Sequence, residues 1–421
     1  MPQPVSPRIA ELQAAVSRGE SAAVAAFWEA LAASGAPIVE PIEGDPSRVL
    51  VTFAWRDGDA ERRNVVLNLA CLRPDPPNQQ LARIDGTDVW YRTLALPQAL
   101  RATYQFSPDD PLVSMIELSQ HDAMVLWGER VRAWQADPLN AKRIEYFPKL
   151  QTVSVLELPH ARPAAYVDER AGVPPGRIET IDYARAEGDP ARKMWIYTPP
   201  GYDAGAGPYA LALFFDGAMH RNGIRATFDN LIAERRVPPF VAVMMHQLDR
   251  DAELTCNDAF VDVVVREMLP WLGERYALTD DAALRVVGGT SYGAVASLHL
   301  ALRHREAFAN VISQSGSYWW GPGAEPPFRL EDAAIEWEWM IARAEASSVA
   351  PMRVYMNVGE LEAAPRPGEI DMLGPNRKMR DVLASRGHAV SYDEYCGGHE
   401  WVCWRAALPE ALAFAWENAR G

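Results

Sequence analysis

A serine that lies between two glycines is the first feature of the sequence that could do chemistry. Residues 289–293 read GTSYG and fit the pattern G-x-S-x-G, with Ser291 at the centre. The apolar run 283–289 predicts a buried strand before the pattern, and residues 294–306 predict a helix after it. A serine on such a turn exposes its hydroxyl, and the helix dipole there favours a developing negative charge. The context predicts a catalytic nucleophile, with an ordinary N-cap serine as the alternative.

A serine nucleophile needs a general base, and the position of one histidine fits that task. The chain contains eight histidines, of which His399 follows two glycines just after the last predicted strand, 389–396. Triads of this type run along the chain in the order serine, acid, histidine. His399 is therefore the predicted base, and the alternative is a histidine in a surface loop.

Carboxylates after the strand predicted at 352–358 are candidates for the third member of the triad. Glu360 and Glu362 lie directly after this strand, and Asp371 is a weaker third candidate. The acid would hold the imidazole in one tautomer and stabilise its protonated form. The residues alone do not separate these carboxylates from ordinary surface groups.

Two backbone N–H groups are needed to bind the oxyanion of a tetrahedral intermediate. We expect Tyr292, directly after the serine, to supply one of them. The second should come from the loop at 216–219, where we expect Gly217 and Ala218 to donate and Gly217 to adopt a positive φ. The alternative is an ordinary turn.

The elements that must position these groups alternate between apolar strands and helices. Strands are predicted at 193–200, 209–217, 240–246, 283–289, 309–316, 352–358 and 389–396, and helices at 225–236, 256–276, 294–306, 331–345 and 373–386. Such alternation indicates a parallel sheet covered by helices on both faces. With the serine motif, it predicts an α/β-hydrolase domain over residues 156–421.

The first part of the chain has a different periodicity. Residues 7–33 predict a helical segment, and four β-rich runs separated by turn-forming residues follow it, at 49–56, 64–72, 88–97 and 100–108. Short strands at this spacing predict an antiparallel β-sandwich, used for binding or packing. We therefore expect an α/β protein in which a β-sandwich domain, 1–155, precedes the hydrolase domain. Residues 151–180, rich in proline and glycine, are the predicted linker.

Composition excludes several classes of function. The formal net charge of −15 gives no general attraction for nucleic acid, and no stretch of 18 apolar residues predicts a membrane helix. The four cysteines form no CxxC pair, and no H-E-x-x-H motif or Cys/His cluster predicts a metal site. The N-terminus has no signal-peptide pattern. We expect a cytoplasmic protein without a cofactor, in an oligomeric state that the sequence leaves open.

Longer motifs resemble those of the enterochelin esterase family, the hydrolases of ferric trilactone siderophores. They are VTFAWR (51–56), GTDVWYRT (86–93), RATYQFSPDD (101–110), WIYTPPGY (195–202), FFDGAMH (214–220), GGTSYGAVASL (288–298), SQSGSYWW (313–320) and GGHEWVCWRAAL (397–408). Ser291 matches the family's nucleophile and His399 its histidine, and Glu362 lies near its acidic position. His220 stands where an aromatic residue is common in the family.

The resemblance implies an esterase that cleaves the ester bonds of a tri-serine lactone siderophore such as enterobactin in the cytoplasm. Iron would then be part of the substrate and not a metal held by the protein. A ferric tris-catecholate is a trianion, so we expect arginines in its pocket, with Arg250 first and Arg221 behind it. Trp319 is a candidate for stacking on a catechol ring, although core packing is the commoner use of such a residue.

Two other functions are compatible with the same residues. A general carboxylesterase or peptide-lactone hydrolase would use the same fold and the same triad. A non-catalytic siderophore-binding protein is the other alternative, and the intact serine, histidine and candidate acids argue against it.

Overall fold

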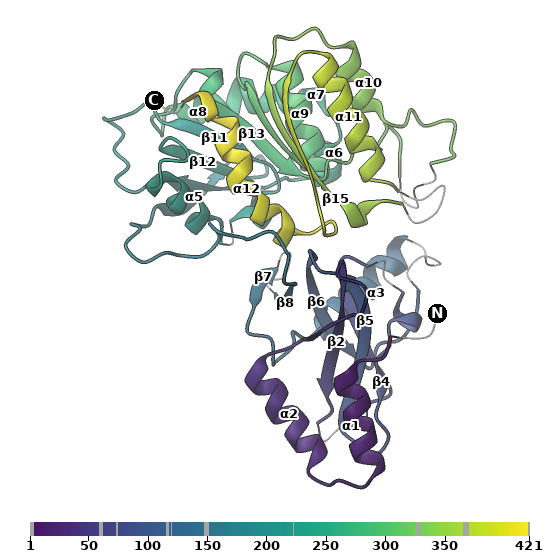
Figure 1. Cartoon of the computed structure of the whole chain (residues 1–421). Coiled ribbons are helices and arrows are strands. Elements are labelled where there is room, and N and C mark those ends of the chain that lie inside the picture. The colour runs from purple at the N-terminus through teal and green to yellow at the C-terminus, as the bar shows by residue number, and fades with distance from the viewer. Residues whose placement is uncertain are drawn as a thin grey trace. The chain divides into compact units, whose positions relative to one another are not determined.

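The computed structural model of the chain describes residues 4–58, 62–72, 75–114, 118, 120–146, 151–221, 223–325, 328, 330–364 and 370–419. The chain forms two compact units (Figure 1). The first unit contains Met1–Arg162 and Cys396–Val402, and the second contains Pro163–Tyr395 and Cys403–Gly421. Each unit has its own hydrophobic core, as is expected of a domain.

Two antiparallel sheets of four strands form the first unit, which confirms the predicted β-sandwich. One sheet contains β1 (Ile38–Pro41), β2 (Arg48–Arg56), β5 (Val89–Pro97) and β4 (Ala82–Arg83), and the other contains β3 (Val65–Leu69), β6 (Arg101–Pro108), β8 (Gln151–Glu157) and β7 (Arg143–Tyr146), in these orders. The rings of Phe53 on β2 and Tyr104 on β6 are buried, with centroids 4.8 Å apart. The inner faces of the two sheets therefore share one core.

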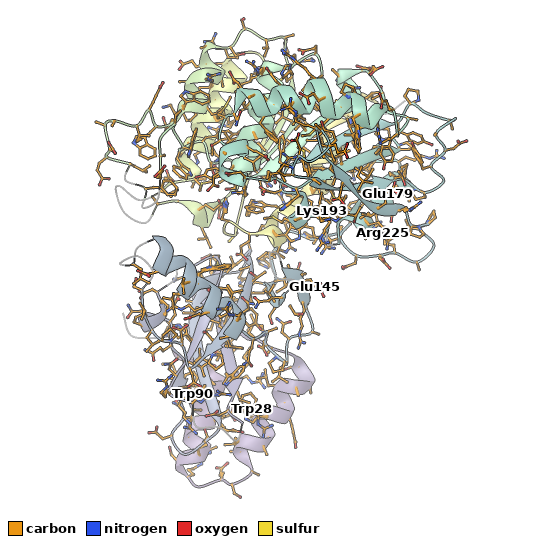
Figure 2. All side chains as sticks on the ribbon, turned by 180° about the vertical axis from the view of Figure 1, so that it is seen from behind. Trp28, Trp90, Glu145, Glu179, Lys193 and Arg225 are labelled. Atoms are coloured by element: carbon orange, nitrogen blue, oxygen red, sulfur yellow. The ribbon has the colours of Figure 1, made fainter. Side chains whose placement is uncertain are left out.

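Helices α1 (Pro7–Ser17) and α2 (Ala23–Ser34) confirm the predicted helical segment. Trp28 of α2 is buried and donates from Nε1 to Asp88 Oδ1 at 2.9 Å, beside the start of β5. Figure 2 labels Trp28 and Trp90 in this unit. A third helix, α3 (Gln120–Ala133), was not predicted.

A sheet of eight strands forms the second unit, in the order β16-β15-β14-β13-β11-β12-β10-β9. The strands are β9 (Arg177–Tyr183), β10 (Arg192–Thr198), β11 (Ala210–Phe214), β12 (Phe240–Met245), β13 (Arg285–Thr290), β14 (Asn310–Gln314), β15 (Arg353–Gly359) and β16 (Ala389–Tyr395). The strands from β16 to β12 run parallel, as predicted. Figure 2 labels Glu179 on β9 and Lys193 on β10, at the opposite edge.

At that edge, β10 pairs antiparallel with both β12 and β9, so the prediction of a parallel sheet is wrong there. The physical reason lies in the connections. Parallel neighbours need a long crossover, usually a helix. The stretch 183–210 is described throughout and contains no helix, so the connections from β9 to β10 and from β10 to β11 lack the helical crossover that parallel strands use.

Helices cover both faces of this sheet, as Figure 1 shows with α5 and α12 in front and α7 and α9 behind. They are α4 (Gly217–His220), α5 (Ile224–Ala233), α6 (Arg250–Leu254), α7 (Asp258–Val263), α8 (Leu269–Gly273), α9 (Tyr292–Arg303), α10 (Trp339–Ala346), α11 (Leu373–Ser385) and α12 (Trp401–Ala415). The π-helical turn Val264–Met268 joins α7 to α8, within the helix predicted at 256–276. The layered arrangement confirms the α/β-hydrolase fold.

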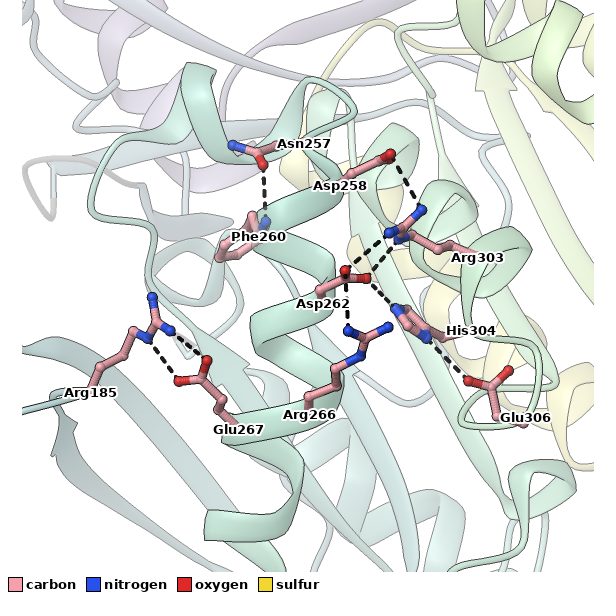
Figure 3. Close-up of polar contacts among 10 residues, drawn as sticks. All are labelled: Arg185, Asn257, Asp258, Phe260, Asp262, Arg266, Glu267, Arg303, His304 and Glu306. Carbon is pink, nitrogen blue, oxygen red and sulfur yellow. Dashed lines mark hydrogen bonds and ion pairs between the residues drawn. The ribbon is translucent and has the colours of Figure 1, made fainter.

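Ion pairs fix the last turn of α9 to α7 (Figure 3). Asp262 of α7 accepts from Arg303 Nε at 2.7 Å and lies 2.7 Å from His304 Nε2. The opposite end of α9 begins directly after Ser291. These contacts therefore anchor the helix whose first turn carries the predicted nucleophile.

Two other predicted boundaries are wrong. Residues 151–157 form β8, a ladder strand, although their region was predicted to be a linker; the prolines of the region begin only at Pro159. The helix predicted at 331–345 starts at Trp339, because Glu338 adopts a left-handed conformation with φ 59° that interrupts a helix.

Candidate active site

Ser291 stands at the turn between β13 and α9, as predicted. Its φ is 56° and its ψ is −120°, a combination that a residue with a side chain rarely adopts. Such strain persists only where the surroundings enforce it, and it is typical of active sites. The conformation is that of a nucleophile elbow and not that of an ordinary N-cap.

The two glycines of the motif are required by close packing of the main chain. A Cβ at Gly289 would lie 2.5 Å from the carbonyl carbon of Gly293. A Cβ at Gly293 would lie 3.1 Å from Asp216 Oδ2. The turn therefore has no room for a side chain at Gly289, and a side chain at Gly293 would require Asp216 to shift.

Hydrogen bonds tie Ser291 to the next strand of the sheet. Its N–H donates to the carbonyl oxygen of Gln314, at the end of β14, at 2.9 Å. Its Oγ lies 3.1 Å from the Oγ of Ser317, which is buried. The sequence analysis did not single out Ser317, although it lies in the motif SQSGSYWW, directly after a predicted strand.

The loop after β11 brings candidate oxyanion donors to the carboxyl ends of the parallel strands, where Ser291 also lies. Gly217 and Ala218 begin α4, and Tyr292 begins α9, so their N–H groups lie in first turns, where intrahelical acceptors are missing. The positive φ of this loop, 56°, belongs to Asp216 and not to Gly217, contrary to the prediction. Gly217 is needed for a different reason, since a Cβ there would lie 2.2 Å from the carbonyl carbon of Met244.

Glu362 is the candidate acid that the structure holds in place most firmly. The residue is 7% exposed. Its Oε1 accepts from Ser315 Oγ at 2.6 Å, from the N–H of Gly359 at 2.8 Å and from the hydroxyl of Tyr395 at 3.1 Å. One carboxylate oxygen is thus fixed by neighbours, as an acid that orients a histidine requires.

The other two carboxylates have different surroundings. Glu360 is exposed. Asp371 accepts from the N–H groups of Ala364, Leu373 and Gly374 at 3.1–3.2 Å, so it orders the start of α11. Neither resembles an orienting acid.

His399 is exposed and lies in the segment Cys396–Val402, which belongs to the first compact unit. The residues around it are held firmly. Glu400 is 1% exposed, and its Oε2 accepts from both the N–H and the Oγ1 of Thr103 on β6, each at 2.7 Å. A Cβ at Gly398 would lie 2.8 Å from the Cα of Cys71. The sequence analysis did not anticipate these contacts, which join positions that are each about 300 residues or more apart.

Comparison with known proteins decides the family. Residues 188–415 match the family model described as "Putative esterase", and residues 50–166 match the model described as "Enterochelin esterase, N-terminal". The chain belongs to the enterochelin esterase family. It is therefore a carboxylic ester hydrolase.

Relatives match over almost their full length. The iron(III) enterobactin esterase of Dickeya dadantii is 28% identical, with 97% of this chain and 95% of that protein covered. The iron(III) salmochelin esterase of Escherichia coli is 25% identical, with 96% of each covered. The solved ferric enterobactin esterase of Salmonella typhimurium is 27% identical with a TM-score of 0.76, covering 94% of this chain and 99% of that one. The enterobactin esterase of Shigella flexneri, solved in the presence of enterobactin, is 26% identical with a TM-score of 0.74, covering 94% and 98%.

The residues predicted to bind substrate in this esterase have partners within the protein. Arg250 forms a bidentate ion pair with Asp216, both hydrogen bonds measuring 2.8 Å. The guanidinium of Arg221 lies over the ring of Trp195, 5.0 Å from its centroid. Trp319 is 5% exposed, and the centroid of its ring lies 4.9 Å from that of the Phe328 ring, so Trp319 is a core residue.

The described residues contain no group of three or more His, Cys, Asp or Glu side chains that could hold a metal ion. All four cysteines lie in the described part of the chain, and no disulfide joins them. Within the same part, no helix is long and apolar enough to cross a membrane.

Proposed function

We propose that the protein hydrolyses the ester bonds of a ferric trilactone catecholate siderophore such as enterobactin, with Ser291 as nucleophile, His399 as general base and Glu362 as the acid. The observation that carries the proposal is the strained elbow at Ser291, with φ 56°, in a chain whose full-length relatives are named iron(III) enterobactin and salmochelin esterases. Iron enters the reaction only as part of the substrate. The reaction is proposed to take place in the cytoplasm.

The residues support acyl transfer in two steps. Ser291 Oγ attacks the ester carbonyl carbon while the imidazole of His399 accepts its proton. The C–O bond then breaks, and the departing alkoxide takes that proton, which leaves an acyl-enzyme. Water, deprotonated by the same imidazole, attacks the acyl carbon, and Ser291 regains its proton as the carboxylic acid leaves.

Backbone donors stabilise the negative charge of each tetrahedral intermediate. We assign this task to the N–H groups of Tyr292, Gly217 and Ala218. These residues lie in the first turns of the helices that follow the carboxyl ends of β13 and β11. Donors that are fixed before the reaction cost no reorganisation as charge develops. The close packing of Gly217 on Met244 and of Gly289 on Gly293 supplies that rigidity.

The charge of the substrate predicts a cationic side chain in the pocket. Arg221 keeps this role as a prediction, with Trp195 beneath its guanidinium. The charge of Arg250 is offset by its ion pair with Asp216.

A panel of esters tests the proposal. Purified protein is incubated with ferric and iron-free trilactone siderophores and with 4-nitrophenyl butyrate, and products are identified by mass spectrometry. Opening of the trilactone ring by one water, followed by smaller fragments, is the expected result. Cleavage of the aryl ester with every trilactone intact would favour a general carboxylesterase. Binding of the siderophore without cleavage of any ester would favour a binding protein.

A further inference from the structure

The loops that follow β11 and β12 are tied together by an ion pair beside the serine. Arg250, the first residue of α6, donates from Nε to Asp216 Oδ1 and from a terminal nitrogen to Oδ2, both at 2.8 Å. Asp216 is 8% exposed, whereas the side chain of Arg250 is 41% exposed. A bidentate pair of this kind fixes direction as well as charge.

Asp216 is also held through its main chain. It adopts the left-handed conformation, with φ 56°, and its N–H donates to Gln247 Oε1 at 3.1 Å. Gln247 lies in the loop after β12, and Arg250 begins α6 directly after that loop. The segment 247–250 therefore holds residue 216 by its side chain and by its N–H, next to Gly217 and Ala218.

The same ion pair touches the other side of the proposed oxyanion hole. The first turn of α9 approaches Asp216 so closely that a Cβ at Gly293 would lie 3.1 Å from Asp216 Oδ2. The guanidinium carbon of Arg250 lies 5.4 Å from the ring centroid of Tyr292, within the range of a cation–π contact. Arg250 and Asp216 together thus contact both sources of oxyanion donors.

Charge gives the arginine a second task. Burial opposes its positive charge, but the hydrogen bonds to Asp216 and the charge of that carboxylate outweigh burial, so the pKa of Arg250 is raised. Without the arginine, a buried carboxylate would lose this counter-ion beside the place where negative charge develops. An uncompensated buried charge is strongly unfavourable.

We propose that the Arg250–Asp216 pair is a positioning device for the oxyanion hole, and that Arg250 acts through Asp216 and Tyr292 instead of binding the anionic substrate. The inference rests on the proposed function, because it assumes that Gly217, Ala218 and Tyr292 bind the oxyanion. A substrate ligand would act on KM for charged esters alone. A positioning pair should act on kcat for charged and neutral esters alike.

Four variants test the proposal: Arg250→Ala, Arg250→Lys, Asp216→Asn and the double variant Arg250→Ala/Asp216→Asn. Asparagine suits the left-handed conformation at position 216 and removes the charge. Arg185→Ala is the matched control, because it removes an exposed bidentate pair with Glu267 on the same unit. For each variant, kcat and KM are measured with the ferric trilactone and with 4-nitrophenyl butyrate, and the Kd of phenylboronic acid, which forms a tetrahedral adduct with an active serine, is measured as well.

The expected result for Arg250→Ala is a fall in kcat of at least about tenfold for both esters, since displacing an oxyanion donor costs less than the loss of about a hundredfold that removing one causes. Affinity for phenylboronic acid should fall by a similar factor while KM changes less than about threefold. Arg250→Lys should retain part of the activity, and the double variant should be faster than Arg250→Ala. Arg185→Ala should match the wild type.

Three outcomes would overturn the inference. One is a rise of KM for the charged ester with no change for the neutral one, which would make Arg250 a substrate ligand. Another is a double variant that is no faster than Arg250→Ala when both have the wild-type melting temperature. The third is a wild-type kcat in both Arg250→Lys and Asp216→Asn. This outcome would overturn the inference even if Arg250→Ala does not fold. Failure of the proposed function is distinct, since the wild-type protein would then leave every trilactone intact, whatever the variants do to the aryl ester.

Discussion

The serine and the histidine of this esterase are held in two different ways. Ser291 stands on a turn between a buried strand and a buried helix, and the main chain is packed too closely at Gly289 for any side chain. His399 is exposed and lies between β16 and α12, and its neighbours Gly398 and Glu400 approach Cys71 and Thr103, all within the first unit. The proposed nucleophile is placed by local geometry, whereas the segment of the proposed base is placed by contacts between distant parts of the sequence. Disruption of either should therefore fail in a different way.

Among the changes that leave the serine in place, breaking the elbow should give the largest effect. Gly289→Ala places a methyl group 2.5 Å from the main chain of Gly293, so the turn must open. Activity on 4-nitrophenyl butyrate should fall by about a hundredfold or more, and overpacking should lower the free energy of unfolding by about 1–3 kcal/mol. Gly273→Ala is the control, because nothing lies within 4 Å of a Cβ there. Equal behaviour of the two variants would show that the turn tolerates rearrangement.

Removing the acid should come next. Glu362→Ala should lower kcat by at least about a hundredfold, since the third member of a triad can contribute about ten-thousandfold. It should also lower the melting temperature, because Ser315, Gly359 and Tyr395 lose a shared acceptor. Glu360→Ala should have almost no effect because that side chain is exposed. Asp371→Ala should lower stability more than activity because it orders the start of α11. Mild and equal effects on kcat would indicate a serine–histidine dyad.

Loosening the segment of the histidine should have a moderate effect. Glu400→Ala removes the carboxylate that accepts two hydrogen bonds from Thr103. The buried N–H of Thr103 then loses its acceptor. Hydrogen bonds to a charged group contribute about 1.5–3 kcal/mol, so a fall in kcat of about tenfold is expected if part of this energy orients His399. Glu410→Ala, on the exposed side of α12, is the matched control. An unchanged kcat in Glu400→Ala would mean that the segment is ordered without Thr103.

The smallest effect concerns pH and stability. Burial lowers the pKa of His220 to about 4, and the nearby charge of Asp216 opposes this only in part. The unfolded chain, with a pKa near 6.5, binds a proton that the folded protein excludes, so this residue costs no stability above about pH 6.5 and destabilises the fold as pH falls from there to about 4. His220→Phe should flatten the loss of stability over that range in thermal unfolding, since the ring of Phe214 lies 5.0 Å away and an apolar ring fits. His160→Phe, at an exposed site, should leave the slope as it is.

Local pattern was enough to predict the features that depend on local geometry. The elbow, the alternation of strand and helix and the N-terminal β-sandwich all follow from periodicity and glycine positions within short windows. The antiparallel edge at β10 was missed because apolar periodicity does not encode strand direction. Helix α10 was placed too early because nothing in the residues marks the left-handed Glu338.

Pairings between distant residues could not be predicted in the same way. Arg250 was expected to face the substrate, and Glu253, three residues further along the chain, carries a negative charge that could also pair with it. The structure pairs Arg250 with Asp216 and Glu253 with Arg192 instead. Either carboxylate would balance the charge of Arg250, so only the fold decides which of them pairs with it. The same holds for Glu400 and Thr103, whose meeting depends on the whole course of the chain.

The central claim is that Ser291 opens a trilactone siderophore, and one measurement tests it most directly. Wild-type protein and Ser291→Ala are each incubated with ferric enterobactin, and the products are followed over time by mass spectrometry. The account predicts ring opening by the wild-type protein and a rate lower by about a thousandfold or more in the variant, with unchanged binding of the ferric ligand. Hydrolysis by Ser291→Ala at a rate near that of the wild type, or an intact trilactone after incubation with the wild-type protein, would contradict it.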